Sequence, residues 1–154
     1  MRFLRRFLKG LLKSTSDISL PEKVYGEEDL SRYLLSSSYF ARTKGQVKYS
    51  AFMPNSQGKT SIYRVSGLED ETIWEIGENF VRKPIIKKQP SCKLHGRADF
   101  KGNAVFECAL EVVADTSPHP RHADLVGWAD NKPSRQMAAT QLANSARLRL
   151  LALD

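Results

Sequence analysis

Apolar residues at the start of the chain recur with the spacing of a helix. They fall on one side of a helical projection, and cations occupy the opposite side. The apolar positions are Phe3, Leu4, Phe7, Leu8, Leu11 and Leu12, interleaved with Arg2, Arg5, Arg6, Lys9 and Lys13. This pattern predicts a basic amphipathic helical arm over residues 1–13 and a linker over residues 14–26. We favour an arm that docks its apolar face on the domain or on a partner protein. The alternative is an arm that lies on an anionic membrane.

The next apolar pattern predicts a helix and then a hairpin. Acids crowd the first turn of residues 27–37, where they suit the helix dipole, and Leu30, Tyr33 and Leu34 form an apolar face. Residues 49–65 show two strand-like runs on either side of a turn rich in Asn, Ser and Gly. We therefore expect a helix over 27–37 and an antiparallel hairpin over 49–65.

The second half of the chain mixes helical and strand-like periods. The expected elements are a helix over 69–81 stopped by Pro84, strands over 93–100, 110–115 and 122–128, a helix over 134–146 that follows Pro133, and a terminal strand over 147–153. Residues 104–109 fit a helix or a strand, and we favour a strand or an irregular segment there. Strands and helices mixed in one chain of 154 residues indicate an α+β fold. We expect one domain over residues 27–154, with a mostly antiparallel sheet partly covered by about three helices, plus the N-terminal amphipathic helix.

The charge of the protein is concentrated at one end of the chain. The formal net charge is +7, of which residues 1–13 supply +5. A second set of cations is interleaved with aromatic residues between positions 39 and 52, and it comprises Arg42, Lys44 and Lys48. Cations mixed with aromatic rings can bind the phosphates and stack the bases of single-stranded nucleic acid. A polar loop that leads into a core strand explains the same residues, and both interpretations stay open.

Composition also restricts the cellular setting. Cys92 and Cys108 are too few and too far apart for a disulfide framework or a paired zinc site. No apolar run approaches the roughly 20 residues that span a bilayer, and cations interrupt the N-terminal segment where a signal peptide needs an apolar core. We expect a cytoplasmic protein, which touches a membrane only if the arm does.

The best candidate chemistry lies in two similar motifs. HGRAD at 95–99 and PRHAD at 120–124 each place a histidine and an arginine at a predicted strand start. If the two strands are neighbours, His95 and His122 would serve as base and acid, while Arg97 and Arg121 would bind a phosphate. If they are not, the aspartates and arginines of these motifs form ordinary turn caps and surface ion pairs.

Cofactor motifs are missing from the sequence. It contains no glycine-rich phosphate loop, no zinc-type pairing of Cys and His and no nucleophile elbow. His119 and His122, with Asp115 or Asp124 as a third ligand, lack a fourth metal ligand. We therefore expect no cofactor and no metal.

Several segments also resemble a family of small uncharacterised bacterial proteins. They are LSRYLLSS, KYSAFMP, TSIYRVSGL, IWEIGE, HGRAD and PRHADLVGW, within residues 28–150. The resemblance omits the N-terminal arm, and it implies a free-standing bacterial domain without implying an activity.

These observations favour a non-enzymatic bacterial binding or accessory module, whose partner is nucleic acid, a protein or an anionic membrane. The alternative is a small metal-independent phosphodiesterase or ribonuclease that uses the two histidines and two arginines. In the stretch SPHPRHADLVGW, we expect Leu125, Val126 and Trp128 to belong to a core strand. We expect His119, Arg121 and His122 to be at least partly exposed, because prolines precede them and cannot join a sheet ladder.

Overall fold

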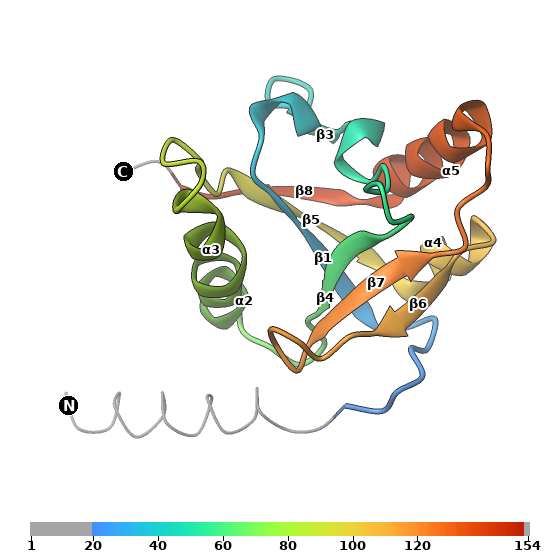
Figure 1. Cartoon of the computed structure of the whole chain (residues 1–154), viewed down its shortest axis with the longest axis horizontal. Coiled ribbons are helices and arrows are strands. Elements are labelled where there is room, and N and C mark those ends of the chain that lie inside the picture. Colours follow the sequence, from blue (N-terminus) through green and yellow to red (C-terminus); the bar gives the residue numbers. More distant parts are fainter. Residues whose placement is uncertain (1–19, 153–154) are drawn as a thin grey trace.

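A computed structural model describes residues 20–152 of the chain (Figure 1). Its strands are β1 (Asp29–Leu34), β2 (Phe40–Ala41), β3 (Gln46–Val47), β4 (Thr60–Arg64), β5 (Gly96–Lys101), β6 (Glu111–Ala114), β7 (His122–Val126) and β8 (Arg147–Leu150). The helices are the 3₁₀ turns η1 (Ser37–Tyr39) and η2 (Tyr49–Ala51), the α-helices α2 (Asp70–Ile76), α3 (Lys83–Ile86), α4 (Gly102–Glu107) and α5 (Lys132–Ser145), and the π-helix η3 (Gly77–Arg82). The predicted arm over residues 1–13 lies outside the described residues.

The strands form a six-stranded antiparallel sheet in the order β6-β7-β4-β1-β5-β8, with β2 and β3 as a separate short ribbon. The predicted α+β class and mostly antiparallel sheet are confirmed. In Figure 1, α4 and α5 lie to one side of the sheet, while the continuous helical segment α2–η3–α3 lies on the other. None of the helices in residues 20–152 has the length and apolar character to cross a bilayer.

The sheet separates two clusters of buried apolar residues. The larger cluster includes Leu30, Leu34 and Leu125 from the sheet together with Phe52 and Leu142, all of which are fully buried. The smaller cluster lies under α2 and η3 and includes Tyr33, Tyr63, Val65, Ile73 and Ile76. The two faces of the sheet therefore have separate cores.

The predicted helix over 27–37 is wrong, because residues 29–34 form β1. This strand lies in the middle of the sheet, between β4 and β5, and it is buried on both faces. When both faces of a strand are covered, apolar side chains need not alternate, so Leu30, Tyr33 and Leu34 also fit a helical spacing.

Two further expectations fail for local reasons. The first half of the predicted hairpin, near residue 49, is the 3₁₀ turn η2, so β4 pairs with β1 and β7 instead. Residues 102–107 form the helix α4 where we favoured a strand. The other predicted strands and the helix over 134–146 are found, within a few residues, as β4, β5, β6, β7, β8 and α5.

Pro84 does not end the helix that contains it. The segment runs from Asp70 to Ile86, and its middle is the π-helix η3, where the Lys83 N–H donates to the Glu78 carbonyl five residues earlier. In an α-helix, a proline ring clashes with the carbonyl four residues before it. The wider π turn displaces that carbonyl, so the helix continues through the proline. π segments of this kind often occur at functional sites.

The predicted linker over residues 14–26 is described only from residue 20 onward. This part of the chain packs on the domain, because Val24 is buried in the larger core and the Pro21 carbonyl accepts a hydrogen bond from Arg64 at 2.6 Å. A Cβ atom on Gly26 would lie 1.8 Å from the Asn103 side chain, so the chain makes close contact here. The folded domain therefore begins before residue 27.

Candidate functional site

A cavity of about 490 Å³ lies between the sheet and the segment η3–α3. Its aromatic walls are Tyr33, Tyr39, Tyr63 and Phe80, and its polar walls include Arg32, Ser36, Ser61, Gln89, Cys92 and His122. This volume lies in the range of sites for small ligands, which combine apolar walls with a few converging polar groups. None of the side chains that line it is a carboxylate.

Strand register brings Ser61 and His122 together at this cavity. In the β4–β7 pair, Tyr63 lies opposite His122 and Ser61 lies opposite Asp124, so all four side chains are on one face of the sheet. The Ser61 Oγ and His122 Nε2 atoms are 2.6 Å apart. On the other side of the ring, His122 Nδ1 lies 2.8 Å from the main-chain carbonyl oxygen of Asp115. A carbonyl can only accept, so Nδ1 carries the proton and the neutral ring accepts the serine proton at Nε2.

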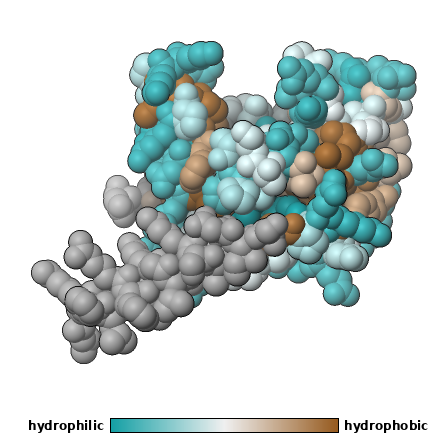
Figure 2. All heavy atoms as spheres, turned by 60° about the horizontal axis from the view of Figure 1, so that its bottom comes forward, coloured by the Kyte–Doolittle hydropathy of each residue, from teal (hydrophilic) through white to brown (hydrophobic). Residues whose placement is uncertain are grey.

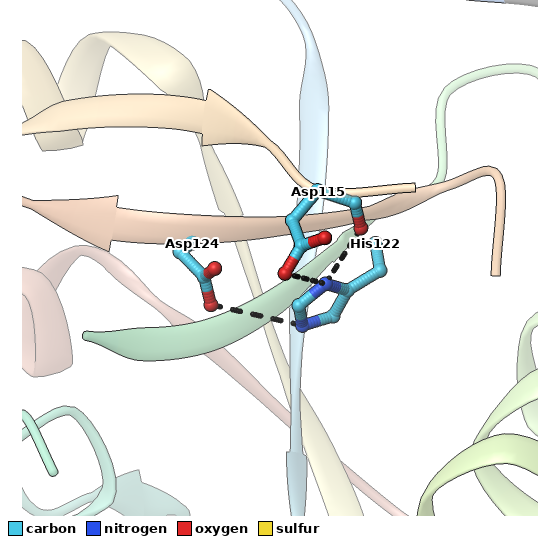
Figure 3. Close-up of side chains that lie close together, drawn as sticks. All are labelled: Asp115, His122 and Asp124. Carbon is cyan, nitrogen blue, oxygen red and sulfur yellow. Dashed lines mark hydrogen bonds and ion pairs between the residues drawn. The ribbon is translucent and has the colours of Figure 1, made fainter. Parts of the chain in front are cut away.

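Two carboxylates flank the same imidazole ring (Figure 3). The nearest oxygen of Asp115 is 3.8 Å from Nδ1, and that of Asp124 is 3.7 Å from Nε2. Burial raises the pKa of the Asp124 carboxyl, the nearby His122 ring lowers it, and the neighbouring Asp115 raises it further. Burial, with help from the Asp124 charge, also raises the pKa of Tyr63 to about 12.

Asp115, His122 and Asp124 are also the described residues that could hold a metal ion. One donor atom from each lies within 4.8 Å of the other two. The Nδ1 side of the ring is occupied by the Asp115 carbonyl, which leaves Nε2 as the metal-binding nitrogen. Such a carbonyl contact is common behind metal-binding histidines, but it also orients a histidine that acts as a base.

Arg32 brings a positive charge to the cavity without a carboxylate partner. Strands β1 and β4 pair only at Leu30 and Ser31, and beyond this point the Arg32 side chain bridges them. Its Nη1 donates to the Ser61 carbonyl and its Nε to the Ala51 carbonyl, both at 2.9 Å. No acceptor for its Nη2 and no carboxylate partner exist among the described residues. Burial lowers the pKa of this guanidinium, which is the effect of removing a charge from water without full compensation.

The four residues expected to form a phosphodiesterase site are not brought together. His95 and Arg97 belong to β5 and its approach, whereas Arg121 and His122 are at the start of β7, and strands β1 and β4 lie between β5 and β7. Three strand spacings amount to about 14 Å. The condition on which that hypothesis depended, neighbouring strands, is therefore not met.

Three of these four residues have local contacts of their own. Arg97 is 1% exposed, donates to Asp99 and Asp70, and stacks over Trp74 at 4.5 Å. Arg121 donates to the carbonyl of Arg64 at 3.0 Å. The ring of His95 lies 5.8 Å from that of Phe40. His122 alone lines the cavity.

The predicted exposure of His119, Arg121 and His122 is wrong, because none of the three is more than 7% exposed. Phe80 from η3 packs edge-on against the His119 ring at 4.6 Å, and Tyr63 packs against His122 at 5.3 Å. The prolines do keep this segment out of the sheet, but the helical segment covers it. Leu125 is in the core as expected, whereas Val126 and Trp128 are only partly buried and Trp128 lies beyond the end of β7.

The predicted basic residues Arg42, Lys44 and Lys48 are exposed around the β2–β3 ribbon. This ribbon follows Tyr39, and the exposed lysines Lys83 and Lys87 flank the α3 residues on the opposite wall of the cavity. The two sequence segments that supply most of its lining, residues 30–68 and 79–98, contain no Asp or Glu. On the face drawn in Figure 2, hydrophilic residues predominate and apolar patches are small and separate.

Sequence reasoning missed Ser61, Arg32 and the Asp115 carbonyl as site groups. Ser61 is an ordinary serine in a β-branched strand, and no local motif marks it. The one sequence signal near these groups is the absence of Asp and Glu from residues 30–68. The arm residues Phe3 to Leu12 lie outside the described part of the chain.

No family model, curated protein or solved structure matches this chain. The resemblance to a bacterial family therefore stays a prediction, and function is argued from the geometry of the site.

Proposed function

We propose that the chain is a binding module for single-stranded nucleic acid, with one base held in the cavity between the sheet and η3–α3. The observation that carries this proposal is the lining of the cavity, which combines aromatic rings with an arginine that has no carboxylate partner. Bases stack on aromatic rings, and phosphates neutralise cations.

Charge around the cavity supports an anionic partner. The acid-free segments 30–68 and 79–98 each contain six Lys or Arg residues. The exposed ones include Arg42, Lys44, Lys48, Lys83 and Lys87. A polyanion that crosses both walls of the cavity would release counterions as it binds these side chains.

A single strand fits this site better than a duplex. A base can enter a cavity only when it is unstacked and unpaired, which is the ordinary state of bases in loops and single strands. Tyr39 is partly exposed and Phe80 is 38% exposed, so both rings are accessible for stacking from the cavity.

The test is fluorescence anisotropy with a labelled single-stranded oligonucleotide of roughly twelve nucleotides, within the usual range of site sizes. Tyr39→Ala and Phe80→Ala leave the net charge unchanged, so the basic arm contributes equally to every variant. Loss of one stacked base weakens binding by about 1–3 kcal/mol, or roughly 5- to 150-fold in Kd. Tyr25→Ala is the matched control, because Tyr25 is 61% exposed and does not line the cavity.

Competition with duplex DNA of the same sequence completes the test. We expect the duplex to compete poorly with the single strand. If Tyr39→Ala and Phe80→Ala bind as tightly as the native chain, the cavity is not the site and the attraction is one of charge alone.

A further inference from the structure

Ser61, His122 and Asp115 have the spacing of a nucleophile, a base and a group that orients the base. The serine oxygen lies 2.6 Å from Nε2, and the Asp115 carbonyl holds the opposite ring nitrogen at 2.8 Å. Both side chains line the 490 Å³ cavity, so a substrate there has access to the hydroxyl. We propose that Ser61 is a nucleophile with His122 as its general base, and that they hydrolyse a carboxylic ester held in this cavity.

The surroundings of the ring favour the charge that this reaction creates. When His122 takes the serine proton it becomes an imidazolium, and the Asp115 and Asp124 carboxylates lie 3.8 and 3.7 Å from its two nitrogens (Figure 3). In serine hydrolases a carboxylate beside the ring stabilises this cation and fixes its orientation. Here the main-chain carbonyl of Asp115 fixes the orientation, and the carboxylates supply the negative charge.

The reaction proceeds in two balanced halves. Ser61 Oγ attacks the carbonyl carbon of the ester, and its proton passes to His122 Nε2. The bond from carbon to the alkoxy oxygen then breaks, and the alcohol leaves with that proton. Water next attacks the acyl group on Ser61 and gives a proton to Nε2, and the serine oxygen leaves and takes this proton back. The products are one carboxylic acid and one alcohol for each ester and water consumed.

The single histidine is the reason for choosing a carboxylic ester over a phosphodiester. At a carbonyl carbon, nucleophile and leaving group occupy one tetrahedral centre, so one imidazole serves both as base and as acid. At phosphorus, the attacking and leaving oxygens are roughly in line, on opposite sides. A second acid would then be needed opposite His122, and His95 lies on the far side of β1 and β4.

Arg32 is the only Lys or Arg among the residues that line the cavity, and we assign it to the oxyanion of the tetrahedral intermediate. Its Nη1 donates to the carbonyl of Ser61 itself, which ties the guanidinium to the residue that carries the nucleophile. Its Nη2 has no acceptor among the described residues. Donors aimed at a developing oxyanion in a site shielded from water are a major source of catalysis.

A fluorophosphonate probe tests the nucleophile directly in the full-length chain. The serine oxygen attacks phosphorus, fluoride leaves, and the serine proton passes to His122, so the chain gains one phosphonyl group that intact-mass and peptide mass spectrometry locate. We expect one group per chain, on Ser61. Ser61→Ala should remove this labelling, and His122→Gln should slow it by at least about 100-fold, the lower limit for loss of a general base. Hydrolysis of a p-nitrophenyl ester should fall in parallel.

The controls use matched residues of the same chain. Ser145 donates to the Leu142 carbonyl and His95 is partly buried, and neither residue lines the cavity, so Ser145→Ala and His95→Gln should label at the native rate. Circular dichroism of each variant shows whether it folds. If His122→Gln does not fold, Ser61→Ala still tests the nucleophile, because this substitution removes only one oxygen atom. Native chain that remains unlabelled, or label that persists in Ser61→Ala, overturns the proposal.

This inference shares its cavity with the proposed nucleic-acid binding but does not depend on it. Added single-stranded oligonucleotide should slow labelling of Ser61 if a base occupies the cavity. If the oligonucleotide does not change the rate of labelling, Ser61 stands as the nucleophile, and the result argues against a nucleotide base in the cavity. If the native chain is not labelled but Tyr39→Ala binds the oligonucleotide more weakly, the proposed nucleophile is overturned and the proposed binding function stands.

Discussion

The two faces of the six-stranded sheet differ in the kind of side chain that fills them. On the face toward α5, Leu30, Ile62 and Leu125 are fully buried against apolar neighbours. On the face toward α2 and η3, register aligns polar residues across five strands. The row that runs through all five strands is His122, Tyr63, Ser31, Asp99 and Arg147. On the same face, Asp124 lies opposite Ser61 in the β4–β7 pair, and Tyr33, Arg97 and Arg149 lie side by side on β1, β5 and β8. One face therefore serves mainly stability, and the other carries the groups from which a site can be built.

The polar face remains folded because nearly all its groups find partners. Ser31 donates to Asp99, Tyr33 donates to the Ile73 carbonyl, and Arg97 bonds to two carboxylates. The Nη1 atom of Arg97 is an exception, since it is buried without a hydrogen-bond partner. An unpaired buried donor costs about 1–3 kcal/mol, so this face is less optimised for stability than the other.

The largest expected effect comes from a cavity in the core on the apolar face. Leu125→Ala removes a fully buried side chain from the centre of the larger core. We expect a loss of about 2–5 kcal/mol in the free energy of unfolding, measured by urea denaturation. Val113→Ala on the adjacent strand β6 is the control, because Val113 is 48% exposed and should change stability by less than about 0.5 kcal/mol. Equal effects of the two substitutions would show that the apolar face is not the main source of stability.

A substitution on the polar face should cost less, although it removes a larger side chain. Arg97→Met breaks the hydrogen bonds to Asp70 and Asp99 but also eliminates the unpaired Nη1 and keeps an apolar contact with Trp74. Both carboxylates stay accessible to water, since Asp70 is 57% and Asp99 is 28% exposed. We expect a loss of about 1–3 kcal/mol in the same denaturation experiment. A loss larger than that of Leu125→Ala would reverse the comparison.

The smallest expected effect is on the melting temperature of the protein at acid pH. Hydrogen bonds from Arg97 and then Arg149 lower the pKa of the Asp70 carboxyl. A lowered folded-state pKa means that the stabilisation is complete above the ordinary carboxyl range and is lost as pH falls through the folded pKa. The native chain should therefore melt slightly higher than Asp70→Asn at neutral pH, and this difference should shrink as the pH falls below about 4. A difference that is constant down to pH 2 would show that the charge of Asp70 does not contribute.

Prediction from the sequence succeeded where a strand or helix carries its own signal. β7 follows two prolines and begins an apolar run, and α5 has Pro133 in its first turn with the Asn131 side chain capping the Ser134 N–H. It failed at β1, whose spacing suits a helix until both faces are known to be covered. The site was missed for the same kind of reason, since nothing local distinguishes Ser61 from other strand serines.

The sequence by itself determined the α+β class, the places of most strands and the long helix, and the concentration of cations in two acid-free segments. These follow from periodicity and composition, which are properties of neighbouring residues. Only the tertiary structure decided that β1 and β4 lie between the two histidine motifs, and that the Ser61 hydroxyl meets His122 across 61 residues of chain. Strand order and register set such contacts, and they depend on how all the strands cover one another's faces.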